Sequence, residues 1–480
     1  MRRIYARELS FHSVESLSAL LGFESEETLA FIDTMASRGI LRPRTDNDIC
    51  DYDTDVSGQV WGTYQFVFVG LVIYHDILLI LYPKYISESE PPLKKLKQIF
   101  SVLRKASKDY SDITAASDDV LQENNHLALM LALMESYDGH GIYSNYVRTK
   151  KLNGPGMVSW ERTIASMTPF ISDGTPVYYD YETIETSKNS SDFITMLHEC
   201  VLTECSSFLS QSGVMSLLGI DEIDLSASPL EEFGTIDYIV YRIEQEQSQQ
   251  YVTWKQDVLA LLLRYIKEKG VHKNPCEVAC FGTTSFYHLW ETACKVAFGD
   301  CLNRKICNVV SNLSQEWAED SQKTLLEILP KPVWKAIDER GNERDCGSAS
   351  TLIPDIVTIW DEPDQGLIFA ILDAKYYTPR LAENLAGIPG VGSVTKQILY
   401  QSAYKKFISD NGFKDVINAF IVPAEETDPR PIGVVRFPGV FAQENKPFCN
   451  GVTMYSLPAE DVFNAYLSNK SLDIHLANCC

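Results

Sequence analysis

The clearest hydrophobic pattern lies in the C-terminal half of the chain, where short apolar runs alternate with longer amphipathic segments. A continuous apolar run of strand length, bounded by turn residues, is typical of a strand buried on both faces. The run from Leu367 to Leu372 is of this kind, because the turn-like sequence DEPDQG precedes it. The pattern predicts the order helix, strand, strand, strand, helix, strand, over residues 283–300, 331–338, 352–360, 366–377, 392–410 and 416–424.

The N-terminal half is predicted to be mostly helical around one apolar strand pair. The segment from Tyr64 to Pro83 is apolar enough to suggest a membrane helix, but His75 and Asp76 lie at its middle. Two strands that turn at this point fit its many β-branched and aromatic residues better than a membrane span. The polar sequence EQEQSQQ, residues 244–250, is predicted to be a linker. The other predicted elements are two short helices within residues 14–41, helices over 91–105, 124–136, 192–211 and 253–268, and a strand over 175–184.

Length, composition and charge narrow the class of protein. The chain has 480 residues, of which 45% are hydrophobic, so we expect two or three domains with real cores. No CxxC pair occurs among the twelve cysteines, and the first residues lack an apolar signal region, which favours a reduced, cytoplasmic setting. The formal net charge of −23 argues against a protein that coats nucleic acid, but it allows a nuclease with a local basic cleft.

Three charged residues lie at the ends of two predicted neighbouring strands. Asp373 and Lys375 end the run 366–377 and share one face of an extended chain, because side chains alternate with period two. Asp355 begins the preceding strand, so a hairpin would bring it close to Asp373. A salt bridge that caps a strand would explain Asp373 and Lys375 alone. It would not explain a second acid, because two neighbouring carboxylates are costly unless a cation lies between them.

A hard divalent cation fits this arrangement. Mg²⁺, with Mn²⁺ as the alternative, prefers carboxylate oxygens, and the lysine can orient or help to deprotonate a water molecule beside it. Such a site suits phosphodiester hydrolysis, because the metal lowers the pKa of water and neutralises charge that develops on the phosphate. The pattern is therefore compatible with a metal-dependent nuclease, with a strand-capping salt bridge as the alternative.

The same residues resemble a known superfamily. The sequence IPDIVTIW followed by ILDAKYY, with flanking helices, is similar to the PD-(D/E)xK nucleases. The sequences FYHLWETACKVAFGD, TKQILYQSAYKKF and GMVSWERTI resemble the LlaJI-type restriction endonucleases, which are relatives of the McrC nuclease subunit. The sequence FVGLVIYHDILLILYPKYI resembles the entry region of McrC. The resemblance covers most of the chain from about residue 60.

This resemblance implies roles for individual residues. Asp355 and Asp373 would hold the metal, and Lys375 would serve the attacking water. Glu291 matches an acidic residue that such nucleases often place on the helix before the sheet, and the alternative is a surface glutamate. The auxiliary candidates, whose roles stay open, lie on the helix after the hairpin and are Gln397, Tyr400 and Gln401.

The implied fold is a mixed α and β multidomain chain. It comprises an N-terminal α/β region that docks on a partner, a helical middle and a C-terminal α/β core like that of PD-(D/E)xK restriction endonucleases. The expected segments are a winged-helix-like segment over 1–60, a McrC-like docking region over 61–185, a helical connecting region over 186–270 and the nuclease domain over 271–480.

The resemblance also implies partners, namely DNA as substrate and a McrB-like AAA+ GTPase or ATPase, with no membrane. The chain has no GxxxxGK[ST] loop, so another chain must drive any nucleotide-dependent step. Two segments could project toward the motor, the strand-pair tip at residues 74–76 and the loop at 147–160. The alternative functions are a non-catalytic activator of the motor and a self-sufficient restriction endonuclease that finds its own site.

Overall fold

The computed structural model describes residues 1–44, 63–111, 126–189, 192–271, 278–347, 351–362, 366–382, 385–438, 448, 451–474 and 476. The chain forms two compact units, which are each composed of several segments. The first unit comprises Met1–Arg2, Val72–Leu78 and Gln122–Phe281, and the second comprises Arg3–Leu71, Leu79–Leu121 and Gly282–Cys480. The prediction of a mixed α and β multidomain chain is confirmed.

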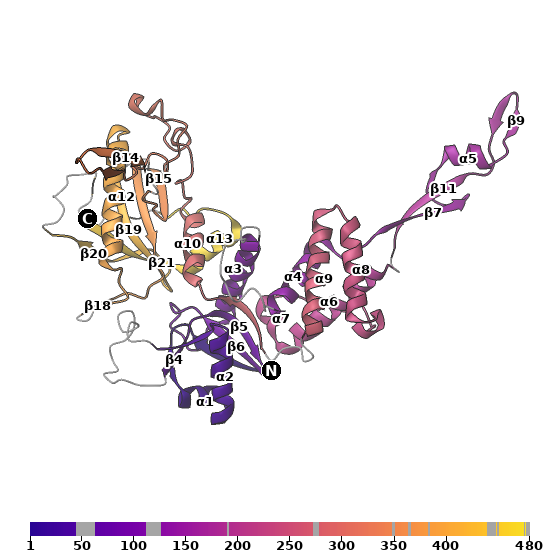
Figure 1. Cartoon of the computed structure of the whole chain (residues 1–480), viewed down its shortest axis with the longest axis horizontal. Coiled ribbons are helices and arrows are strands. Elements are labelled where there is room, and N and C mark those ends of the chain that lie inside the picture. Colours follow the sequence, from indigo (N-terminus) through magenta and orange to yellow (C-terminus); the bar gives the residue numbers. More distant parts are fainter. Residues whose placement is uncertain are drawn as a thin grey trace. The chain divides into compact units, whose positions relative to one another are not determined.

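A five-stranded sheet forms the centre of the C-terminal part of the second unit (Figure 1). Its three inner strands are buried almost throughout, as expected for apolar runs that are covered on both faces. The first pair and the last pair are antiparallel, and the inner pairs are parallel. The strand order is β15 (Ile356–Glu362), β16 (Gly366–Ala374), β19 (Asp415–Ala424), β21 (Gly451–Pro458) and β20 (Arg430–Arg436).

Helix α12 (Val391–Asp410) covers one face of this sheet. Phe369 of β16 packs against Tyr404 and Phe407 of α12, with ring centroids 5.0 and 6.2 Å apart. Ile371 belongs to the same core cluster. Because side chains alternate along a strand, Asp373 continues this face at the end of β16. Helix α10 (Phe286–Ala297) also contacts β16, and it packs against α13 (Ala459–Ser468), which in turn contacts α3 (Leu93–Ser111).

One predicted core strand lies outside this sheet. Residues 331–338 contain β13 (Trp334–Ile337), which pairs with β14 (Glu343–Gly347) in an antiparallel hairpin of its own. All residues of both strands are exposed. The predicted strand is therefore confirmed, but it lies outside the central sheet. The physical reason is that its apolar run is only four residues long and interrupted by Lys335, so it cannot be buried on both faces.

The predicted N-terminal strand pair is confirmed. β5 (Val69–Tyr74) and β6 (Ile77–Tyr82) are buried at every position, and the chain turns at His75, whose φ is 51°. They lie in a sheet with β1 (Arg2–Arg7) and β12 (Val278–Thr283), in the order β1-β6-β5-β12. Among the helices that the structure describes, none combines the length and apolarity needed to cross a membrane.

Two predicted short helices near the N-terminus are also confirmed. One strand precedes these helices and two strands follow them, and the three strands form a small sheet with the order β2-β4-β3. In chain order, the helices and strands of this part are β2 (Phe11–Ser13), α1 (Val14–Leu21), α2 (Ser25–Ser37), β3 (Leu41–Pro43) and β4 (Thr63–Phe66).

The first unit is mainly helical, and the predicted linker lies inside one of its helices. Residues 244–250 overlap α8 (Ile236–Gln249), so the linker prediction is wrong. The helix buries Ile239 and Ile243 on one face, and its polar residues bind neighbouring elements, because Glu246 accepts a hydrogen bond from Tyr143 at 2.6 Å. The other helices of this part are α4 (His126–His140), α6 (Phe193–Ser212), α7 (Val214–Leu218), a 3-10 helix (Leu230–Phe233) and α9 (Thr253–Val271).

A long arm extends from these helices within the first unit (Figure 1). Its two long strands pair over seven positions, from Leu152 opposite Glu182 to Tyr146 opposite Lys188. The arm consists of β7 (Tyr146–Leu152), β8 (Met157–Val158), α5 (Trp160–Ser166), β9 (Phe170–Ser172), β10 (Thr175–Val177) and β11 (Glu182–Lys188). The remaining short elements of the second unit are α11 (Ile306–Val309), a 3-10 helix (Gln315–Trp317), β17 (Arg380–Leu381) and β18 (Leu385–Ala386).

Candidate functional site

The β15–β16 hairpin brings the two predicted acids together. In its register Ile356 lies opposite Leu372, so Asp355 and Asp373 are opposite each other one position further along. The Asp355 Oδ2 atom accepts a hydrogen bond from the Ala374 N–H at 3.2 Å. Asp373 is only 6% exposed. The hairpin juxtaposition expected from the sequence is therefore confirmed.

Lys375 completes this group at the end of β16. Its Nζ atom lies 2.6 Å from Asp373 Oδ1, and its side chain is 22% exposed. The Lys375 N–H donates to the Ile421 carbonyl of β19 at 2.9 Å, which fixes the backbone at this point. Burial lowers the pKa of Lys375, but attraction to Asp373 and Asp355 more than offsets this effect, so the pKa is raised and the ammonium stays charged.

The two carboxylates are a costly pair in the absence of a cation. Burial, followed by hydrogen bonding to Asp373 and repulsion from it, raises the pKa of Asp355 to about 7. Among the described residues, no group of three or more His, Cys, Asp or Glu side chains is arranged to hold a metal ion. A carboxylate pair nevertheless fits Mg²⁺, which binds through one or two carboxylates and takes its other oxygens from water and phosphate.

Glu291 lies on α10 and pairs with a lysine of the same helix. Its Oε1 atom is 2.6 Å from Lys295 Nζ, and its side chain is 26% exposed. Burial and then the charges of Asp355 and Glu291 raise the pKa of the Cys294 thiol, so both acids act on one buried atom. Burial lowers the pKa of Lys295, but its interactions with Glu291 and Asp355 raise this pKa overall. The ion pairs of Glu291 itself are with Lys295 and His288 on the same helix, so its role in the site stays a prediction.

The candidates on α12 have different surroundings. The Tyr400 hydroxyl donates to the Ile353 carbonyl at 2.9 Å, two residues before Asp355. Burial and then the charges of Asp355 and Asp373 raise the pKa of Tyr400 to about 12. Gln397 is fully buried and donates to the Ala419 carbonyl of β19 at 3.3 Å, so it joins helix to sheet. Gln401 is 4% exposed.

Sequence reasoning missed one acid that holds the start of β15. Asp300 follows α10, and its Oδ1 atom accepts hydrogen bonds from the Val357 N–H at 2.9 Å and the Leu302 N–H at 3.2 Å. This carboxylate ties the end of the helix to the strand that begins next to Asp355. The sequence signal was an aspartate directly after a helix, but such residues are too common to identify the contact.

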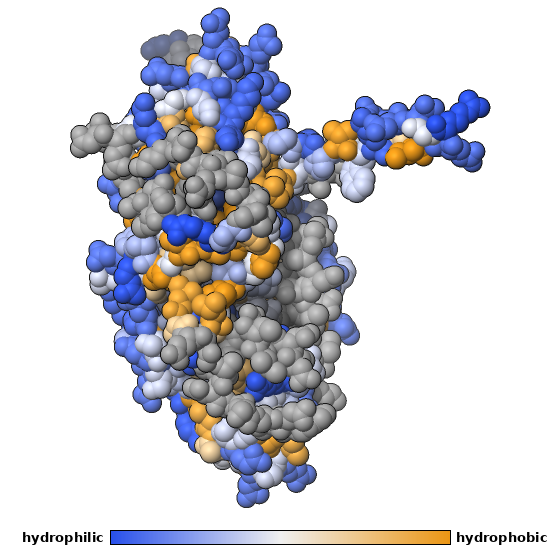
Figure 2. All heavy atoms as spheres, turned by 90° about the vertical axis from the view of Figure 1, so that its left-hand side faces the viewer, coloured by the Kyte–Doolittle hydropathy of each residue, from blue (hydrophilic) through white to orange (hydrophobic). Residues whose placement is uncertain are grey.

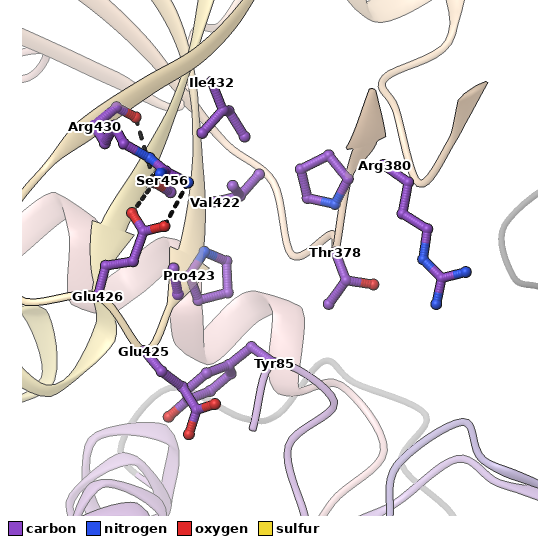
Figure 3. Close-up of a pocket in the computed structure, with 12 residues that line it drawn as sticks. Tyr85, Thr378, Arg380, Val422, Pro423, Glu425, Glu426, Arg430, Ile432 and Ser456 are labelled. Carbon is purple, nitrogen blue, oxygen red and sulfur yellow. Dashed lines mark hydrogen bonds and ion pairs between the residues drawn. The ribbon is translucent and has the colours of Figure 1, made fainter. Parts of the chain in front are cut away.

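A pocket of about 490 Å³ lies at the carboxyl ends of β16 and β19 (Figure 3). Its wall includes Thr378 to Arg380, which begin three residues after Lys375. Glu426 is held there by Arg430 at 2.6 Å and by the Ser456 hydroxyl at 2.7 Å, as Figure 3 shows. In α/β sheets such a position is a usual place for ligands. The pocket is lined by Tyr85, Thr378, Pro379, Arg380, Val422, Pro423, Ala424, Glu425, Glu426, Arg430, Ile432 and Ser456.

Hydrophobic side chains are also exposed near the C-terminal sheet. Leu385 is 65% exposed and Val391, at the start of α12, is 67% exposed. Figure 2 shows a group of hydrophobic residues near the middle of the face that it draws. Exposed apolar surface of this kind is a candidate contact area for another macromolecule.

Comparison with known proteins shows a match over most of the chain. The family described as LlaJI restriction endonuclease matches residues 68–437. The type II restriction enzyme BsuMI component YdjA of Bacillus subtilis (strain 168) is 25% identical over 423 residues, which cover 85% of this chain and 82% of the relative.

Two similar solved structures come from Thermococcus gammatolerans, and both are 12% identical to this chain. One is a refined half-complex from a tetradecameric assembly of McrB AAA+ hexamers with bound McrC, at a TM-score of 0.36 over 97% of this chain and 99% of that chain. The other is a cryo-EM structure of the McrBC complex, at a TM-score of 0.21 over 55% of this chain and 79% of that chain. The family match covers most of the chain, so the chain belongs to the LlaJI restriction endonuclease family.

Proposed function

We propose that this chain is the nuclease subunit of a restriction or antiphage-defence system and that it hydrolyses DNA phosphodiester bonds with Mg²⁺. The observation that supports this most directly is the meeting of Asp355, Asp373 and Lys375 at the end of one hairpin. Their occurrence in a chain of a restriction endonuclease family is the second support. In this proposal, residues 271–480 form a PD-(D/E)xK core.

Each residue then has a distinct task. Asp355 and Asp373 hold the metal, which supplies charge neutralisation at the phosphate and a lower pKa for water. The Lys375 ammonium, 2.6 Å from Asp373, donates a hydrogen bond to the attacking water beside the carboxylates. Tyr400 holds the Ile353 carbonyl and so fixes the backbone that carries Asp355. Glu291 adds a further acid on the α10 side.

Substrate recognition is best assigned to a partner. The net charge of −23 disfavours strong phosphate binding by the chain alone. The sequence resemblance to McrC points to a McrB-like AAA+ GTPase or ATPase. A self-sufficient enzyme is less favoured because α2, which would have to read DNA in the segment 1–60, carries Glu26, Glu27 and Asp33. The complete Asp355, Asp373 and Lys375 group disfavours a non-catalytic activator.

The arm is the better of the two candidates for docking on the motor. At the tip of the β5–β6 turn, only His75 and Asp76 are exposed. The arm instead exposes large hydrophobic side chains, including Met157 at 82%, Trp160 at 55% and Ile164 at 60%. It also presents Arg148 and Lys150 on the exposed strand β7. Apolar and basic side chains on an extended element suit insertion into a partner, such as the central pore of a motor ring.

The test is a cleavage assay with the purified full chain. Plasmid DNA is incubated with Mg²⁺, with EDTA, and with a candidate McrB-like AAA+ protein plus GTP or ATP. We expect cleavage that requires Mg²⁺ and increases with the motor. Cleavage of a specific site without the motor would indicate the self-sufficient enzyme. Stimulated nucleotide hydrolysis without any cleavage would indicate the non-catalytic activator.

A further inference from the structure

A buried carboxylate lies outside the group described above. Glu8 follows β1 and is 6% exposed. Its N–H donates to the Tyr82 carbonyl at the end of β6 at 2.9 Å, and the next residue, Leu9, donates to the Phe66 carbonyl at 2.8 Å. Leu9 has a φ of 60°, so the chain turns sharply here. The end of β6 therefore holds the Glu8 backbone, and β4 of a different sheet holds the Leu9 backbone.

The Glu8 side chain reaches the chain segment after Lys375. Its Oε2 atom accepts a hydrogen bond from the Tyr376 hydroxyl at 2.5 Å and from the Lys84 N–H at 3.3 Å. The same Lys84 N–H lies 3.2 Å from the Tyr376 oxygen, and the Lys84 ammonium lies 4.6 Å from the centre of the Tyr376 ring. Tyr376 is 6% exposed and its ring packs on Phe286 of α10 at 5.3 Å. All these residues belong to the second unit.

Tyr376 is the direct chain neighbour of Lys375. The Lys375 backbone is tied to β19 through Ile421, and the Tyr376 side chain is tied to Glu8. In an extended chain, neighbouring side chains point to opposite faces. Holding Tyr376 on one face therefore sets the direction in which Lys375 leaves the other face, toward Asp373.

Stability alone does not account for this contact. Burial raises the pKa of Glu8 more than Lys84 and Tyr376 lower it, so the buried carboxylate is costly to the fold. Well-packed apolar residues of similar volume in place of a buried polar or charged pair are often neutral or stabilising. A buried contact that does not stabilise the fold can instead fix the positions of the residues that it joins.

We propose that Glu8 and Tyr376 form a positioning contact, through which the chain segment at Glu8 holds the Lys375 segment in the orientation needed for hydrolysis. This inference rests on the proposed nuclease function. It makes the segment at Glu8 a structural part of the nuclease site, and it gives a physical route by which an event at this segment can change cleavage.

The test compares Tyr376→Phe, Glu8→Ala and Glu8→Gln in the full chain, with kcat and KM for Mg²⁺-dependent DNA cleavage measured with the motor. We expect Tyr376→Phe and Glu8→Ala to lower kcat by about 10- to 100-fold with little change in KM, because small misplacements of a catalytic group have effects of this size. Glu8→Gln keeps an acceptor for the Tyr376 hydroxyl and is expected to retain most of the activity. The double variant is expected to be no slower than the slower single variant.

Tyr404→Phe is the matched control. It removes another buried hydroxyl from the second unit, one that donates to the Leu325 carbonyl at 2.9 Å. This control is expected to lower stability without changing kcat. A kcat of Tyr376→Phe equal to that of the unmodified chain, or a loss no larger than that of Tyr404→Phe, would overturn the proposal.

A second measurement separates this inference from the proposed function. Amide hydrogen exchange over residues 373–378 is measured without metal or DNA. Faster exchange in Tyr376→Phe and Glu8→Ala, but not in Tyr404→Phe, supports the positioning contact. Unchanged exchange in all three variants contradicts it. If the unmodified chain fails to cleave DNA under any condition, the proposed function is wrong, and the exchange comparison still decides whether Glu8 holds this segment.

Discussion

Replacing Asp355 with asparagine separates a metal site from a structural salt bridge. The Asp355 carboxylate is partly buried and close to Asp373, and its pKa is raised from 3.8 to about 7. A carboxyl group with a raised pKa binds its proton more tightly in the folded chain than in the unfolded chain. In the metal-free protein, its contribution to stability is therefore full below about pH 4 and is lost as the pH rises to about 7.

The size of this effect follows from the pKa difference. The difference between 3.8 and about 7 corresponds to about 4 kcal/mol, at about 1.36 kcal/mol for each unit of pKa. Solvent screening reduces this value, so we expect Asp355→Asn to stabilise the metal-free chain at pH 8 by about 1–4 kcal/mol. The asparagine can still accept from the Ala374 N–H and can donate to Asp373. The same variant should not cleave DNA, because one metal ligand is lost.

The assay is thermal unfolding in EDTA and in Mg²⁺ at pH 5 and pH 8, followed by cleavage. We expect Mg²⁺ to raise the unfolding temperature of the unmodified chain, because a ligand that binds only the folded state stabilises it, and to leave Asp355→Asn almost unchanged. Asp410→Asn is the control, since Asp410 accepts from the Trp317 indole N–H at 2.9 Å at the far end of α12. This control should gain no stability and should keep full cleavage. Destabilisation by Asp355→Asn at pH 8 in EDTA, with retained cleavage, would refute the metal-site interpretation.

Three further predictions follow from the proposed function. Lys375→Met and Asp373→Asn should each reduce cleavage to background while the chain still binds its motor in a pull-down, and cleavage near the normal rate would remove that residue from the mechanism. Replacing residues 153–181 by Asn-Gly joins Leu152 to Glu182, which are opposite each other in the arm, through a two-residue hairpin turn. This variant should fold but should no longer bind or stimulate the motor, and full stimulation would move the docking surface elsewhere. The isolated chain should bind duplex DNA weakly at physiological salt, near the nonspecific range of about 10⁻⁴ to 10⁻⁶ M, and tight selective binding in a fluorescence titration would instead support a self-sufficient enzyme.

Local sequence determined the hairpin and the residues that it joins. The apolar run before Asp373, the turn before that run and the period-two alternation of side chains are properties of neighbouring residues. They were sufficient to predict that Asp355, Asp373 and Lys375 meet, and the structure confirms this arrangement. The same reasoning predicted β5 and β6, because β-branched and aromatic residues flank a polar turn.

Local patterns failed where the partner of a segment decides its structure. Residues 334–337 form a strand as predicted, but only tertiary structure decides that this strand pairs with 343–347 outside the sheet. Residues 244–250 are polar like a linker, yet they are helical because Glu246 and its neighbours bind side chains that are distant in sequence.

The contacts around the candidate site show the same limit. Glu8 and Tyr376 are 368 residues apart, and their hydrogen bond leaves no periodic signal in either segment. Asp300 holds the start of β15 across 57 residues. Sequence patterns identify which residues have the chemistry for a site, because side-chain chemistry and local conformation depend on neighbouring residues. The surroundings that orient those residues depend on long-range contacts, and these form only when the whole unit folds.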